Sequence, residues 1–142
     1  MWWKCRDGKL EEVREELEAG ADPNTTGGPL KRTLLMEAAA RDHREVVGLL
    51  LSSPGIQVNA KSMYNRTALH LACLHGSVAS LSKLLATSGL QLNETDKLGW
   101  TPIMTAIYMG KTEAVRLMAA KPTVCLDVRD NQGRSLEEFA NE

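Results

Sequence analysis

A six-residue motif returns four times at a constant interval, and this periodicity limits the folds open to the chain more than any other feature. The copies begin 34 residues apart, reading TLLMEA at 33–38, TALHLA at 67–72, TPIMTA at 101–106 and, less closely, SLEEFA at 135–140. A second signature precedes each copy: GADPN at 20–24, GIQVN at 55–59, GLQLN at 89–93 and TVCLD at 123–127. Two independent motifs with a shared spacing indicate repeated copies of one small unit.

Each unit has the sequence of a short helix pair followed by an extended finger. Thr101 is a good N-cap and Pro102 a good first helical residue, while Gly76 and Gly110 are suited to end such a helix. An apolar second helix follows, as at 46–51 and 115–118. Units of this size must stack to bury their apolar faces, and the small residues that would let inner helices approach are Ala38, Ala72, Ala106 and Ala140.

The pattern resembles the ankyrin repeat, whose signature is Thr-Pro-Leu-His-x-Ala. The resemblance covers essentially the whole chain and implies an all-α solenoid of stacked helix-turn-helix repeats joined by β-hairpin-like fingers. We expect a single domain over 1–142, divided into a partial N-terminal capping repeat at 1–24, repeats at 25–59, 60–93 and 94–127, and a C-terminal capping repeat at 128–142.

Some positions depart from the family pattern. Asp42 stands where glycine usually ends the first helix, and the signature histidine survives only at His70, so hydrogen bonding between fingers should be weaker elsewhere. The first finger is one residue longer than the others, and its tip at 27–29 is expected to be mobile. Asn59 and Asn93 are interpreted as turn residues that bond their own backbone. The resemblance leaves hydroxylation of these two asparagines as an open alternative.

Composition excludes several classes of protein. The formal net charge is −1, which argues against a nucleic-acid-binding chain. Three widely spaced cysteines do not make a disulfide framework, so reduced thiols and a cytoplasmic or nuclear location are expected. No apolar run approaches the ~20 residues of a membrane span, and the first residues lack the apolar core of a secretory signal. A monomer that does not bind membranes is expected.

Motifs for catalysis are weak. The best cluster is His70, Cys73 and His75, which could suggest zinc or Cys–His chemistry, but a structural histidine and a small buried thiol explain it better. The acidic stretch at 11–18 is interpreted as the solvated face of a capping helix. The sequence therefore predicts no enzyme activity, no metal, no cofactor and no small-molecule substrate.

The resemblance implies that a partner protein or peptide meets the concave surface of finger tips and first helices. The candidate partner-binding residues at those positions are Arg41, Met63, Tyr64, Arg66, Leu74, His75, Lys97, Leu98, Trp100, Tyr108, Met109, Gln132 and Arg134. Tyr64 and Trp100 are the predicted hot spots, with packing of Trp100 and Tyr108 on neighbouring fingers as the alternative.

Charge along the chain indicates what kind of partner fits. Residues 60–93 carry a net charge of +3 between acidic ends, −3 over 1–24 and −2 over 128–142, which favours a partner with an acidic centre. The competing hypothesis is a structural spacer or capping fragment of a larger ankyrin-repeat protein, or an engineered repeat scaffold, with no partner at this face.

Overall fold

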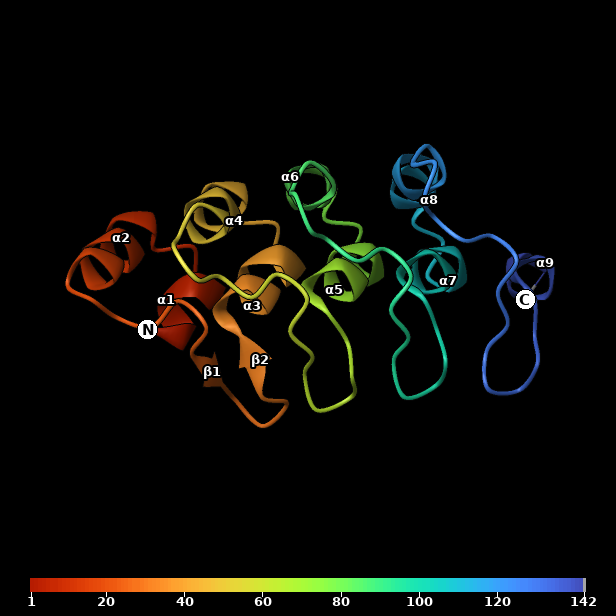
Figure 1. The fold of residues 1–142 in the computed structure, drawn as a ribbon, viewed down its shortest axis with the longest axis horizontal. Coiled ribbons are helices and arrows are strands. Elements are labelled where there is room, and N and C mark those ends of the chain that lie inside the picture. Colours follow the sequence, from red (N-terminus) through yellow and green to blue (C-terminus); the bar gives the residue numbers. More distant parts are fainter. Residues whose placement is uncertain (142) are drawn as a thin grey trace.

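The described residues, 1–141, form two rows of short helices with fingers projecting from one side, in a computed structural model (Figure 1). The inner row, next to the fingers, consists of α1 (Trp2–Arg6), α3 (Leu34–Ala40), α5 (Ala68–His75), α7 (Pro102–Tyr108) and α9 (Leu136–Ala140). The outer row consists of α2 (Leu10–Glu18), α4 (Arg44–Leu51), α6 (Val78–Leu85) and α8 (Thr112–Ala119). The predicted solenoid of stacked helix pairs is confirmed.

The inner helices begin and end as the motifs predict. A hydroxyl at the N-cap accepts a hydrogen bond from the backbone N–H three residues on in α3, α5, α7 and α9, the caps being Thr33, Thr67, Thr101 and Ser135. Gly76 ends α5 with a φ of 65°, and Asp42 takes the same left-handed conformation at 57°. Asp42 is also useful there, because its Oδ1 accepts the backbone N–H of Ser80 at 2.9 Å.

A continuous apolar core lies between the helices. Ala38, Ala72 and Ala106 are fully buried where neighbouring inner helices approach, as predicted. Ala140 is exposed, so the expectation fails for the fourth member of that column. The reason is that no further unit packs on α9 within residues 1–141. A smaller second cluster contains Trp100, Met104 and Phe139.

Successive fingers are joined by hydrogen bonds between their backbones. The backbone N–H groups of Met63, Lys97 and Asn131 each donate to a carbonyl oxygen of the preceding finger, at 3.0–3.1 Å. The first finger also contains a short hairpin in which β1 (Thr26–Gly27) pairs antiparallel with β2 (Arg32–Thr33). The indole of Trp2 lies against the tip of this finger, at Gly27 and Gly28.

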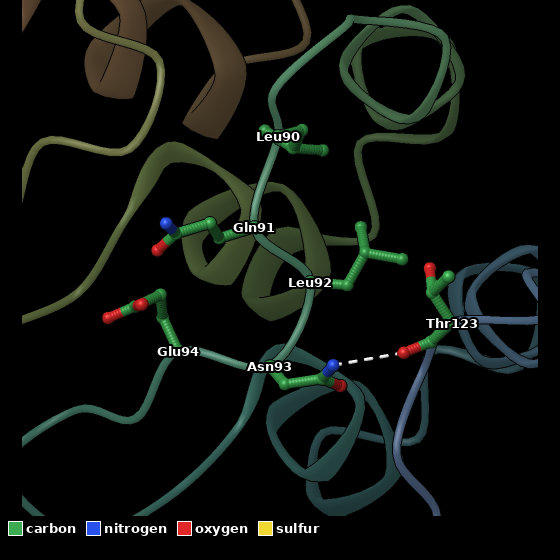
Figure 2. A pocket seen from close by; sticks show the side chains of 6 residues that line it. All are labelled: Leu90, Gln91, Leu92, Asn93, Glu94 and Thr123. Carbon is green, nitrogen blue, oxygen red and sulfur yellow. Dashed lines mark hydrogen bonds between the residues drawn. The ribbon is translucent and has the colours of Figure 1, made fainter.

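A second set of bonds runs along the opposite side of the units and corrects the interpretation of the asparagines. Asn93 Nδ2 donates to Thr123 O at 3.0 Å, and its Oδ1 accepts the backbone N–H of Cys125 at 2.7 Å (Figure 2). Asn59 makes the same two bonds to Gly89 and Gln91. These side chains therefore bridge consecutive repeats instead of bonding their own turns, because the next unit offers both a carbonyl and an amide.

Candidate functional site

Residues at a spacing of 34 form columns on one surface, which we call the finger face. It comprises the finger residues 63–66, 97–100 and 131–134, the first finger at 29–32, and the C-terminal ends of α3, α5 and α7 at 40–41, 74–75 and 108–109. Equal spacing places one side chain per unit in each column, for example Tyr64, Leu98 and Gln132. The repeat itself thus gathers residues that are far apart in the sequence.

Large apolar side chains are exposed on this face. Tyr64, Leu98 and Tyr108 expose 48%, 51% and 50% of their surface, and Met63 and Met109 are exposed as well. Gln132 and Lys97 are exposed beside them, whereas Leu74 is half-buried. The expectation of an exposed apolar row at these positions is confirmed for the tyrosines, the methionines and Leu98.

A shallow apolar hollow lies between the second and third finger tips. Its volume is about 390 Å³, and its walls are Tyr64, Arg66, Asp96, Lys97 and Leu98. Lys97 Nζ lies 6.0 Å from the centre of the Tyr64 ring, at the outer limit of a cation–π contact. The hollow is shaped to accept an apolar side chain between two fingers.

Trp100 does not project from the surface, and the expectation that it is an exposed hot spot is wrong. Only 9% of its surface is accessible, and its ring centre lies 4.8 Å from Tyr108 and 5.0 Å from Phe139. The alternative, packing on neighbouring structure, is confirmed for Trp100. The cause is Phe139 of α9, which supplies an aromatic surface large enough to bury the indole.

Two aspartates that the sequence reading missed organise the fingers. Asp96 is buried and its carboxylate accepts the backbone N–H groups of Leu98 and Trp100 and the Arg66 Nε–H. Asp130 repeats this arrangement 34 residues later, with Arg134 as its charged partner at 2.9 Å. The matching spacing of the two aspartates was the available signal.

Asp130 shows how these bonds compensate for burial of a charge. Burial alone raises the pKa of this carboxyl. Hydrogen bonds from Arg134 and from the backbone of Gln132 outweigh that effect, so the pKa of Asp130 lies below its usual value. Arg66 and Arg134 are both half-buried in these pairs, which limits how freely they can meet a partner.

The finger face presents basic groups outward and keeps acidic groups covered. Arg41 is exposed and makes no hydrogen bond or ion pair within residues 1–141, while Glu37 is only 3% exposed and pairs with Arg32 at 3.1 Å. Partial burial lowers the pKa of His75, and the positive charges of Arg32, Arg41 and Lys111 lower it further. The surface near His75 therefore has a positive potential.

The His70, Cys73 and His75 cluster does not converge on one point. His70 Nε2–H donates to Trp100 O at 2.8 Å, and its Nδ1 accepts the backbone N–H of Thr67. Burial raises the pKa of the Cys73 thiol to about 12, which leaves it a poor nucleophile at neutral pH. Within residues 1–141, no three His, Cys, Asp or Glu side chains are grouped so that they could hold a metal ion.

His70 also explains one departure from the family pattern. Met36 and Met104 occupy its position in the neighbouring repeats, where each sulfur accepts only the N–H of the helix cap. The bond from His70 to the next finger therefore has no counterpart from these methionines, as the sequence predicts.

The largest hollow lies away from the finger face. It has a volume of about 470 Å³ and is lined by residues 90–94 and Thr123, on the loops where Asn93 bridges two repeats (Figure 2). Its one charged side chain, Glu94, is paired with Lys61 at 2.7 Å. The hollow has no converging set of titratable groups, so it is a consequence of repeat stacking. Over residues 1–141, no helix combines the length and apolar character required to cross a lipid bilayer.

Comparison with known proteins identifies the repeat independently. A family profile described as ankyrin repeats (3 copies) matches residues 1–96. The chain is 30% identical over 140 residues to a protein of Saccharomyces cerevisiae named probable 26S proteasome regulatory subunit p28, covering 96% of this chain and 60% of that protein. It is 31% identical over 128 residues to the E3 ubiquitin-protein ligase KEG of Arabidopsis thaliana, covering 87% of this chain and 8% of the ligase.

A bacterial relative extends the comparison. The putative ankyrin repeat protein YahD of Escherichia coli is 25% identical over 134 residues, covering 92% of this chain and 66% of that protein. The chain thus spans less than two thirds of the length of each of these three relatives.

Proposed function

This chain belongs to the ankyrin repeat family, and from that premise we propose that it is a non-enzymatic module that binds a partner protein or peptide on its finger face. Ankyrin repeats are generally protein–protein interaction modules, which supports the class of function. The three free cysteines are consistent with action in the cytoplasm or nucleus.

The observation that carries this proposal is where the exposed apolar side chains lie. Eight large hydrophobic residues are exposed among residues 1–141, and five of them, Met63, Tyr64, Leu98, Tyr108 and Met109, are on the finger face. Scattered exposed apolar groups are ordinary on any protein, but a concentration of tyrosine and methionine on one surface is typical of a binding site.

A second candidate function follows from the lengths of the relatives. The ligase KEG is many times longer than this chain, which matches only 8% of it. A stack of repeats can therefore serve as one part of a larger protein. In that case the module would act as a spacer, and substitutions on the finger face would have no effect on binding.

The test is selection of peptide ligands from a displayed library with the wild-type chain, followed by affinity measurements on variants. Tyr64→Ala and Leu98→Ala should each weaken the selected complex at least tenfold, which corresponds to about 1.4 kcal/mol. Both side chains are about half-exposed, so neither substitution should disturb the core.

Leu126→Ala is the matched control, because Leu126 is 53% exposed but lies in the loop that follows α8. Its affinity should stay within twofold of the wild type. Equal losses in the finger and control variants, or a library that yields no ligand, would contradict binding at the finger face and favour the spacer.

A further inference from the structure

A small cavity lies at the N-terminal end of the finger face, between α1, the first finger and the end of α3. Its volume is about 200 Å³. Aromatic and charged side chains contribute Trp2, Arg6, Arg32, Glu37 and Arg41 to its lining, and the finger tip at 27–30 completes it. The cavity is separate from the apolar hollow between the second and third fingers.

One wall of this cavity is held by close packing of Trp2 on glycine. A Cβ atom at Gly27 would lie 2.4 Å from Trp2 Cγ, and one at Gly28 would lie 3.0 Å from the far edge of the indole. The first finger can therefore sit under the ring only because both residues lack side chains. This packing opposes the mobility expected for the tip at 27–29, although no measurement of motion tests that expectation.

The polar groups around the cavity are mostly donors. Three guanidinium groups line it, and two have acidic neighbours, since Arg6 pairs with Asp7 at 2.8 Å and Arg32 with Glu37 at 3.1 Å. Arg41 is left with no ion pair in residues 1–141. The indole Nε1–H of Trp2 is also buried without an acceptor there, which is unfavourable unless something binds it. One unpaired positive charge and one unpaired donor remain.

We propose that this cavity binds the side-chain carboxylate of an aspartate or glutamate in the partner peptide, an inference that rests on the finger face being the binding surface. Arg41 supplies the charge, and its planar guanidinium can donate two parallel hydrogen bonds to the two carboxylate oxygens. The volume is sufficient for one acidic side chain but not for a folded element.

Charge balance favours a carboxylate over a phosphate group. A carboxylate carries one negative charge, which matches the single unpaired guanidinium of Arg41. A phosphate would carry between −1.5 and −2 close to the buried carboxylate of Glu37, and its extra charge would be repelled there. The direction of the His75 pKa shift supports a positive potential at this end of the face, since Arg32 and Arg41 both contribute to it.

The experiment is a titration of the 15N-labelled full chain, followed by NMR of the arginine Nε–H and tryptophan Nε1–H groups. The probe is N-acetyl-glutamate amide, and N-acetyl-glutamine amide is the neutral probe of equal size. The signals of Arg41 and Trp2, assigned with Arg41→Lys and Trp2→Phe, should shift saturably with the glutamate probe. Its dissociation constant should be at least tenfold lower than that of the glutamine probe.

Arg41→Gln should weaken binding of the glutamate probe at least fivefold, and its amide spectrum should otherwise match the wild type because Arg41 is exposed. Arg44→Gln is the matched control: it removes the same charge from α4, where Arg44 is 62% exposed and pairs with Glu45. Binding to this control should stay within twofold of the wild type.

Three results would overturn the inference: equal affinity for the two probes, equal losses in the two arginine variants, or at least tenfold tighter binding of N-acetyl-phosphoserine amide. The proposed function fails separately, because it is tested by Tyr64→Ala and Leu98→Ala in the apolar hollow. A carboxylate can therefore be shown to bind or not bind in the cavity whatever those finger variants do.

Discussion

At the N-terminal end of the stack Trp2 lies over the glycine backbone of the first finger, whereas towards the C-terminal end Trp100 is enclosed by Tyr108 and Phe139. The first arrangement leaves a charged cavity beside the indole, and the second fills the available space with rings. Two tryptophans in one repeat protein thus have different roles, since one borders a cavity and the other completes a core.

The difference comes from a single column of the repeat. Arginine precedes the helix cap at Arg32, Arg66 and Arg134, and each pairs with a buried carboxylate. Trp100 takes the same position in the third finger, where Phe139 offers an apolar surface instead. An equivalent position therefore becomes polar or apolar according to the neighbour it meets, which teaches that repeat spacing sets location but not environment.

The largest effect should come from breaking the aromatic end of this comparison. Trp100→Ala removes a buried indole and leaves a cavity against Phe139, so the free energy of unfolding should fall by about 3–4 kcal/mol. Urea denaturation followed by circular dichroism measures this change. Trp3→Ala is the control, since Trp3 is 47% exposed and its loss should cost no more than about 0.5 kcal/mol. A loss below about 1 kcal/mol for Trp100→Ala would show that its ring contacts contribute little.

A smaller effect should follow from disturbing the glycine end. Gly27→Ala places a methyl group into the Trp2 indole, so the ring must shift, and we expect a loss of about 1–3 kcal/mol. Gly48→Ala is the matched control, because Gly48 lies within α4 and its new methyl would meet only the flexible end of Lys83. That variant should be neutral or more stable by up to about 1 kcal/mol. Equal melting temperatures for the two variants would argue against close packing of Trp2.

The smallest effect concerns His70, which ties α5 to the backbone of Trp100. Burial lowers the pKa of His70, so the unfolded chain binds its proton more readily than the folded chain does. Stability is therefore complete above about pH 6.5 and declines as the pH falls below that value, by at most about 1.4 kcal/mol per pH unit for this group. Urea denaturation between pH 5 and pH 7.5 measures the slope.

His70→Met supplies the control for that slope, because Met36 and Met104 already occupy the equivalent position. The variant should lose most of the dependence on pH in this range. Partial burial, with nearby positive charge, also lowers the pKa of His75, so His75→Gln measures its share of the same sign. An unchanged slope in His70→Met would assign the effect to other groups.

The fold was predictable because its determinants are local and recur. Thr-capped helices, left-handed residues such as Gly76, and apolar second helices are encoded within a few positions, and the spacing of 34 repeats them. Much of the finger face followed as well, since columns such as Tyr64 and Leu98 are set by that spacing. The burial of Trp100 was not predictable in the same way, because it depends on Phe139, 39 residues further along the chain.

By itself, the sequence determined the repeat, its helices and the surface on which its exposed apolar residues gather. Only the tertiary structure decided that Asn59 and Asn93 bridge units, that Trp100 is enclosed, and that Arg41 is left unpaired beside Trp2. The physical reason is that a local motif specifies backbone conformation, whereas burial and charge pairing depend on which side chains the next unit brings within contact distance.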